Sequence, residues 1–337
     1  MMTLEMRKTV LSVFLCLLAA VSSCHSDEQG KKPGTAKGAS TSAPYELLVV
    51  CNKDWLKTAN GDALKDIVNA EIPCLPQSES YFRTTTIDPV HFNRSFMFYA
   101  NILKADVSPK YAAAECKIAR DVYARPQIIV SLTAPDQASF AALCQQHKQQ
   151  ILDVFNQAEL QREIRLLDKT FSGIVQRQAK HQFRCDIHAP EAINAIKVGK
   201  DFFWASSEGE HENYLNLCMY AYPYTSPKTF TLDYYLAMRD SVMRENIAGM
   251  TEAEYMSTDH RVVLSRDISV DGHYVQEVRG LWQMENAPMG GPFVSYSQVD
   301  TLRRRIIVVE GFVYAPGKDK RNFIRELEAA LQTFRIE

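Results

Sequence analysis

From Asp136 to Ile174 the chain carries mostly apolar residues at the three-and-four spacing of one helix face. These positions are Phe140, Cys144, His147, Ile151, Val154 and Ala158, followed by Leu160, Ile164, Leu167, Phe171 and Ile174. The spacing changes phase near residues 158–160, which predicts a kink there or two helices in sequence. Because an apolar stripe of this length needs a packing surface, we expect it to connect two halves of the molecule.

A coiled-coil dimer is the alternative interpretation of this stripe. The positions beside it, where a coiled coil usually carries paired charges, are dominated by Gln145, Gln146, Gln149 and Gln150. We therefore favour the connector. A chain of 337 residues is long enough for two domains, and we place them at residues 45–178 and 179–337.

Short apolar runs and alternating segments on both sides of the connector predict strands. In the first half we expect strands at 45–51, 94–105 and 127–132, and helices at 55–70 and 109–123. In the second half we expect strands at 183–188, 201–206, 214–222, 273–284, 293–299 and 305–314, and helices at 231–246 and 318–334. Residues 306–309 are apolar on both faces, which is typical of a central strand. The predicted fold class is α+β, with two α/β sandwich halves of mainly antiparallel sheets joined by a long helical connector.

The first 23 residues have the pattern of a secretory signal peptide. Arg7 and Lys8 precede an apolar core at residues 10–21, and small residues then lead to Cys24. This core is shorter than the ~20 apolar residues that span a membrane, so we expect the segment to be removed. The sequence Val21-Ser22-Ser23-Cys24 resembles the bacterial lipobox, which implies that Cys24 becomes an acylated N-terminus carrying palmitate or a similar chain. An ordinary signal peptide with a cysteine at its cleavage site is the alternative.

Residues 24–44 are predicted to form a flexible tether, because they are rich in glycine, lysine and serine and hold no large apolar side chain. Such a segment reaches roughly 25 Å. Asp27 and Glu28 resemble the acidic export signal that some Bacteroidota lipoproteins carry after the lipidated cysteine, although a solvated start to the linker explains them equally well. We expect an outer-membrane lipoprotein of the cell envelope, on the periplasmic face or the cell surface, that contacts the membrane through the lipid at Cys24.

Six cysteines follow Cys24, which would permit three disulfides in an exported protein. Their neighbours favour free buried thiols, because Cys51 ends an apolar run and both Cys144 and Cys218 stand among apolar residues. No CxxC pair is present, which argues against redox catalysis and zinc-ribbon chemistry. The formal net charge of −2 argues against nucleic acid as a main partner.

Two stretches together resemble a known family. They are residues 121–127 (DVYARPQ) and residues 287–293 (APMGGPF), the second followed by residues 308–316 (VVEGFVYAP), Lys320 and Arg321. With the lipobox, they are similar to a Bacteroidota lipoprotein family catalogued only as a domain of unknown function. Separately, the half from about residue 183 onward resembles the Mog1/PsbP-like architecture. That resemblance implies a binding or assembly role.

The strongest candidate for a binding surface lies around a double glycine in the second half. The residues are Trp282, Met289, Gly290, Gly291, Pro292 and Phe293. Glycines permit close approach to the backbone, and the apolar side chains beside them offer a contact surface. The alternative is a hairpin turn at 290–292 whose aromatic neighbours face the core.

A metal site is a weaker hypothesis. The set that could gather is Asp186, His188, Glu208, Glu210 and His211, but the two histidines share no known ligand spacing. A solvated acidic loop explains the last three residues better. We therefore predict no metal and no cofactor.

Catalytic signatures are also missing from the sequence. It contains no GxSxG, HExxH, GxGxxG or phosphate-loop motif, and His260 and His273 stand alone, so we predict no catalytic residues. The basic clusters at 303–305 and 318–321 either contact an anionic partner or lipid headgroups, or are simply solvated. We expect a non-enzymatic envelope protein that binds or helps to assemble an envelope protein or glycan. The alternative is an envelope hydrolase or transferase with a site between the two halves.

Overall fold

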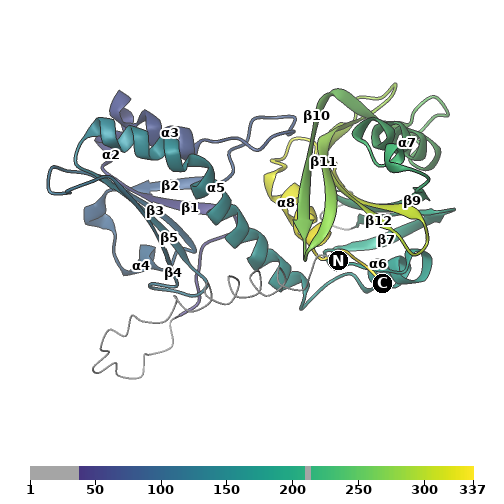
Figure 1. The fold of residues 1–337 in the computed structure, drawn as a ribbon, viewed down its shortest axis with the longest axis horizontal. Coiled ribbons are helices and arrows are strands. Elements are labelled where there is room, and N and C mark those ends of the chain that lie inside the picture. The colour runs from purple at the N-terminus through teal and green to yellow at the C-terminus, as the bar shows by residue number, and fades with distance from the viewer. Residues whose placement is uncertain (1–37, 209–213) are drawn as a thin grey trace, which may run out of the picture. The chain divides into compact units, whose positions relative to one another are not determined.

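The computed structural model describes residues 38–208 and 214–337, and Figure 1 shows their fold. The predicted signal peptide and the predicted acylation site at Cys24 lie outside the described residues. Two members of the hypothetical metal set, Glu210 and His211, also lie outside them.

The described end of the segment predicted as a tether lies against the body of the protein. The backbone amide of Arg125 donates to the carbonyl oxygen of Gly38, and that of Ser40 donates to the carbonyl oxygen of Arg125. Ser42 accepts from the backbone amide of Ala100 at 3.0 Å. The folded body therefore includes residue 38.

A five-stranded sheet with the order β2-β1-β3-β5-β4 organises the first half (Figure 1). Its strands are β1 (Glu46–Val50), β2 (Arg83–Ile87), β3 (Asn101–Val107), β4 (Glu115–Arg120) and β5 (Ile128–Ala134). Strands β2, β1, β3 and β5 run parallel, and β4 pairs antiparallel with β5. One face packs on α2 (Lys53–Lys57), η1 (Ala59–Gly61), α3 (Asp62–Val68) and the start of α5 (Gln137–Leu167).

The connector α5 is one continuous helix of 31 residues, capped by the Asp136 carboxylate, which accepts from the backbone amide of Ser139. The predicted division into two helices near 158–160 is therefore wrong. The phase change marks a change of packing partner: the apolar side chains up to Ala158 pack against the first sheet, whereas Leu160, Ile164 and Leu167 pack against α8 (Arg321–Gln332). The connector itself is confirmed.

A seven-stranded antiparallel sheet with the order β10-β11-β12-β13-β9-β8-β7 organises the second half. Its strands are β7 (Ile193–Gly199), β8 (Phe202–Ser207), β9 (Leu215–Pro223), β10 (Met256–Val270), β11 (His273–Met284), β12 (Gly290–Asp300) and β13 (Arg305–Val313). The predicted central strand is confirmed as β13. Helices α6 (Gly173–Gln178) and α8 pack on one face with the π-helical turn η3 (Ala179–Phe183), and α7 (Leu232–Asn246) packs on the other. Mainly antiparallel sheets and the α+β class are confirmed for the molecule as a whole.

Some predicted elements are wrong. Residues 94–97 form helix α4 rather than a strand, because the Asn93 side chain caps a helical turn by accepting from the backbone amide of Ser95. Residues 115–120, predicted as helix, form the exposed edge strand β4. Of the strand predicted at 183–188, only β6 (Cys185–Asp186) forms, paired with β14 (Arg335–Ile336). The short helices η2 (Pro89–His91) and η4 (Pro227–Thr229) complete the elements.

Candidate functional site

An apolar groove of about 570 Å³ lies on the α7 face of the seven-stranded sheet, beyond the part that α7 covers. We call it the Met/Trp groove. Its lining includes two tryptophans and four methionines: Trp204, Met250, Met256, Trp282, Met284 and Met289. They come from β8, from the segment after α7, from β10, and from β11 and its turn to β12. Phe312 and Tyr314, at and beyond the end of β13, complete one wall.

The Trp282 indole is fixed in the wall of the groove. Its ring nitrogen donates a hydrogen bond to the carbonyl oxygen of Val313 at 3.1 Å, and its ring meets Phe312 edge-on with centroids 5.7 Å apart. Because Trp282 is 2% exposed, the indole is a rigid support for the groove. Trp204 is held in the same way, since its ring nitrogen donates to the side-chain oxygen of Asn216 at 3.0 Å.

The methionines differ in accessibility. Met256 is buried, with its sulfur 3.9 Å from a guanidinium nitrogen of Arg239. Met250 is 97% exposed at the lip, on a loop that the Glu254 carboxylate holds by accepting from the backbone amide of Met250 at 2.8 Å. The backbone amide of Met284 donates to the carbonyl oxygen of Met289 at 2.8 Å, which closes the β11–β12 turn. The groove thus has a fixed floor and an exposed, adaptable lip.

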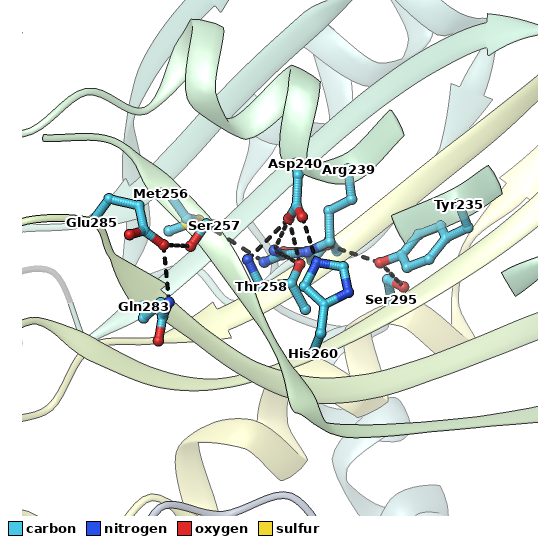
Figure 2. A network of polar contacts seen from close by, with 11 residues as sticks. Tyr235, Arg239, Asp240, Met256, Ser257, Thr258, His260, Gln283, Glu285 and Ser295 are labelled. Atoms are coloured by element: carbon cyan, nitrogen blue, oxygen red, sulfur yellow. Dashed lines mark hydrogen bonds and ion pairs between the residues drawn. The ribbon is translucent and has the colours of Figure 1, made fainter. Parts of the chain in front are cut away.

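A buried ion pair lies under α7 beside the groove, and Figure 2 shows its arginine, Arg239, near Tyr235 and Thr258. The Arg239 guanidinium donates to both carboxylate oxygens of Glu310, at 2.9 and 2.7 Å, and both side chains are fully buried. Burial alone would lower the pKa of Arg239, but the Glu310 carboxylate more than offsets it and the pKa lies above its ordinary value. The Tyr235 hydroxyl also donates to Glu310 and contacts the Ser295 hydroxyl at 2.6 Å. The charges of Arg239 and Glu310 therefore neutralise each other.

The network continues to the surface through Asp240. Its carboxylate accepts from the backbone amide and the hydroxyl of Thr258, and its second oxygen lies 2.7 Å from Nε2 of His260. Figure 2 shows Ser257 turned to Glu285 rather than to the imidazole. In the part of the chain that the structure describes, His260 contacts a carboxylate but no hydroxyl or thiol, so an activated nucleophile is not assembled here.

The structure separates the six residues of the predicted binding surface. Trp282 and Met289 line the Met/Trp groove. Gly291 and Pro292 are buried in β12, and Gly290 is exposed beside them. The Phe293 ring is buried beneath Arg239, with the guanidinium carbon 4.0 Å from the ring centroid. The predicted turn at 290–292 is wrong, because Gly290 and Gly291 pair with β11 and the chain reverses at 285–289 instead.

The hypothetical metal ligands do not gather among the described residues. The His188 imidazole stacks on Phe171, with centroids 4.2 Å apart, and contacts the Asp168 carboxylate at 3.0 Å. Asp186 accepts from the side chain of Gln176. Residues 38–208 and 214–337 contain no group of three or more acidic, histidine or cysteine side chains that could hold a metal ion.

The cysteines of the folded body are unpaired thiols, and two arginines of the basic cluster at 303–305 are paired with an acidic residue. All six cysteines after Cys24 are free, and Cys51, Cys144, Cys185 and Cys218 are buried. Burial raises the pKa of the Cys144 thiol to about 12, so this thiol is unreactive. Arg303 and Arg305 both pair with the Asp300 carboxylate.

Sequence reasoning missed Trp204, Met250, Met284 and Phe312 as parts of the site. These residues lie up to 108 positions apart, on strands and a loop whose arrangement the local pattern does not reveal. The available signal was a count: the second half is rich in methionine and tryptophan, which offer contact surface when they gather.

Fold and groove together define an α+β protein in which a long helix links two sheets and an open apolar groove lies on the seven-stranded sheet. Residues 173–333 match the family described as Domain of unknown function (DUF4837), and residues 40–168 match the one described as Domain of unknown function (DUF8532). The expected match to a domain of unknown function is confirmed, as two families rather than one. No curated protein matches the chain.

Solved structures show only weak likeness. The Saccharomyces cerevisiae Ran-binding protein Mog1p is 9% identical with a TM-score of 0.30, over 45% of this chain and 90% of that one. A point mutant of protein Mog1 gives 10% identity and a TM-score of 0.30 over the same shares. A Bacteroides thetaiotaomicron protein gives 13% identity and a TM-score of 0.20, over 46% of this chain and 45% of that one. At these values none of them bears on function.

Among the residues that the structure describes, no helix is long and apolar enough to cross a membrane.

Proposed function

We propose that this chain is a non-enzymatic binding protein of the cell envelope, anchored through a lipid on Cys24. The Met/Trp groove receives an apolar peptide segment of a partner protein. One observation carries this proposal: among the residues that the structure describes, two tryptophans and four methionines line an open groove with one carboxylate, Glu254, and with no lysine, arginine or histidine. Aromatic and methionine side chains are the residues that binding surfaces favour.

A peptide suits this groove better than an acyl chain does. The volume of about 570 Å³ is within the ~300–1,000 Å³ of ordinary ligand pockets, and flexible thioethers adapt to side chains of different shape. The exposed Asn286 amide and the half-buried Glu254 carboxylate stand among the lining residues, where they can hydrogen-bond a peptide backbone. An acyl chain could not use them.

The envelope location is supported by the leader pattern: Arg7 and Lys8, a short apolar core, and small residues before Cys24. The resemblance to Bacteroidota lipoproteins points the same way. An outer-membrane lipoprotein that exposes an apolar groove is well placed to hold or assemble another envelope protein.

The hydrolase or transferase alternative is not favoured. A hollow of about 110 Å³ lies between α5 and the β10–β11 hairpin, with Arg279, Arg325 and Glu328 among its lining residues. Burial by itself would raise the pKa of Glu328, but the two arginines lower it to about 2. A carboxylate held ionised by two guanidinium groups is a structural ion-pair partner and cannot act as a general acid near neutral pH.

The test is selection of peptides from a displayed random library by the full chain, followed by affinity measurements on the selected peptides. We expect peptides with large apolar side chains, and Met250→Asp should weaken their binding by about tenfold or more. The matched control is Leu302→Asp, at an 80% exposed leucine in the β12–β13 turn outside the groove. Peptides that bind Met250→Asp as tightly as the unchanged chain, or a library that yields only highly charged peptides without large apolar side chains, would refute the proposal.

A further inference from the structure

A second hollow, of about 310 Å³, lies in the first half between α5 and the adjoining ends of β4 and β5. One stripe of α5 forms its wall, since Gln157, Gln161, Arg162 and Arg165 recur at helical spacing. Arg120, the last residue of β4, and Asp121 stand opposite. We call this the arginine hollow. It belongs wholly to residues 120–165 and is separate from the Met/Trp groove.

Arg162 is fixed in this wall by partners of its own. Its guanidinium pairs with the buried Glu159 carboxylate at 2.5 Å and donates to the carbonyl oxygen of Ala100 and to the side-chain oxygen of Asn101. Its Nε, which is buried, has no hydrogen-bond partner among the described residues. Arg162 therefore stands rigidly in the hollow with part of its donor capacity unused.

The one carboxylate that lines the hollow is already engaged. Asp121 accepts from Nε of Arg125 at 3.0 Å and from the backbone amide of Gln127 at 2.9 Å. These contacts fix the turn that leads into β5. Asp121 is therefore engaged by Arg125, which does not line the hollow.

Arg120 and Arg165 are exposed, and within the described residues neither forms an ion pair or a side-chain hydrogen bond. Arg165 also lies close enough to Arg162 to act on it: burial is the main cause that lowers the Arg162 pKa, and the charge of Arg165 lowers it further. Two exposed guanidinium groups, those of Arg120 and Arg165, thus lie at one cavity beside Arg162, whose own charge is paired with Glu159.

We propose that the arginine hollow binds an anion that carries a phosphate group, with Arg120 and Arg165 as the ligating side chains and Arg162 as the fixed wall. A phosphate accepts several guanidinium forks at once and carries up to two negative charges, whereas a monocarboxylate matches one fork. Gln157 and Gln161 add neutral donors at the same rim.

Two sources could supply this chemistry, a soluble phosphate compound or an anionic lipid headgroup. The chain enters the folded body beside the hollow, because Gly38 and Ser40 are hydrogen-bonded to Arg125. If Cys24 is acylated, only thirteen residues of sequence separate the lipid from Gly38, and a chain of that length reaches at most about 45 Å. A bilayer surface would then lie within reach of the hollow.

The experiment uses the full chain with Cys24→Ser, so that no acyl chain contributes to binding. Inorganic pyrophosphate, titrated calorimetrically, is the soluble probe. Vesicles of phosphatidylcholine with and without phosphatidylglycerol, assayed by flotation, are the headgroup probe. We expect binding to at least one of them, and Arg120→Gln with Arg165→Gln should weaken it by about tenfold or more. Both side chains are exposed, so the melting temperature should not change.

The matched control is Arg94→Gln with Arg177→Gln, which removes the same charge at exposed positions outside the hollow. Pyrophosphate binding that only the hollow variant loses identifies a soluble ligand, and binding confined to phosphatidylglycerol vesicles identifies a headgroup. The proposal is overturned if neither probe binds, if the hollow variant binds as well as the unchanged chain, or if the control pair loses binding equally.

Discussion

The indole nitrogen of Trp282 and the carbonyl oxygen of Val313 are joined by a 3.1 Å hydrogen bond that takes the space a side chain at Gly291 would need. A Cβ built on Gly291 would lie 2.0 Å from that oxygen and 3.0 Å from the indole nitrogen. Any residue other than glycine must therefore displace the backbone of β13 or the indole. The glycine that suggested a turn is in fact the residue that lets Trp282 form the wall of the Met/Trp groove.

We predict that Gly291→Ala lowers the free energy of unfolding by about 2–4 kcal/mol, because it adds an overpacked methyl group and breaks a buried hydrogen bond. Urea unfolding followed by tryptophan fluorescence measures the change. Peptide binding in the groove should weaken in the same variant, since the indole can no longer hold its position.

Gly173→Ala is the matched control for this prediction. Gly173 opens α6, and a Cβ there would meet only the tip of the Arg177 side chain at 3.1 Å, which can move away. Stability should stay unchanged or rise by about 0.4–1 kcal/mol, because alanine restricts the unfolded chain. Equal losses in the two variants would show that the close approach at Gly291 is not the cause.

We predict that Glu310→Gln costs about 3–5 kcal/mol, because it leaves the buried Arg239 guanidinium without a counter-charge. The double variant Arg239→Met with Glu310→Leu should cost clearly less than the sum of the two single changes. A double-mutant cycle measured by chemical unfolding checks this. Additive losses would mean that the two side chains do not act as a pair.

This ion pair illustrates where sequence reasoning stops. The Thr231 cap, helix α7 and the inward position of Arg239 are all predictable from local spacing, and the structure confirms them. The partner is not predictable, because Glu310 is 71 residues away on β13 and its place opposite α7 depends on strand order. A buried arginine predicts that a carboxylate lies beside it, but the local sequence does not identify that carboxylate.

The same limit applies to the strands and to the groove. Apolar runs such as 306–309 can be predicted as strands because both of their faces are buried. Strand β10 is not predicted, because exposed residues dominate much of its length and its pairing register shifts between Asp259 and Val263. The double glycine stands out in the sequence, but the sequence does not show whether it forms a turn or part of a strand. Its close approach to Trp282 depends on the pairing of β11 with β12, which the local sequence does not specify.

We predict that Cys24→Ser moves most of the protein from the membrane fraction to the soluble fraction, because it removes the acyl chain that would hold the protein in the bilayer. Fractionation of cells and immunoblotting measure the distribution. Cys116→Ser, at a half-buried cysteine of the folded body, is the control and should leave the protein with the membranes. A Cys24→Ser protein that still sediments with lipid would contradict the anchor.

Two acidic residues of α8, the half-buried Glu326 and the buried Glu328, should affect stability at opposite ends of the pH range. Burial, assisted by the charge of Glu163 on α5, raises the pKa of Glu326 from 4.5 to about 7. Glu328, two positions along the helix, has its pKa lowered to about 2 despite its burial, because Arg279 and Arg325 pair with it. The folded state therefore binds a proton more tightly at Glu326, and less tightly at Glu328, than the unfolded chain does.

The sign of each effect follows from linkage. Protonated Glu326 favours the folded state below pH 4.5, and this contribution is lost as the pH rises through about 7. Ionised Glu328 contributes stability above pH 4.5, which is lost as the pH falls towards 2. We therefore predict that Glu326→Gln raises the free energy of unfolding at pH 8 by about 1–2 kcal/mol and changes it little at pH 4. Glu328→Gln should lower it at pH 8, because Arg279 loses its buried partner. Urea unfolding at the two pH values measures both. If Glu326→Gln were equally stabilising at pH 4 and pH 8, its effect would not arise from the carboxylate charge.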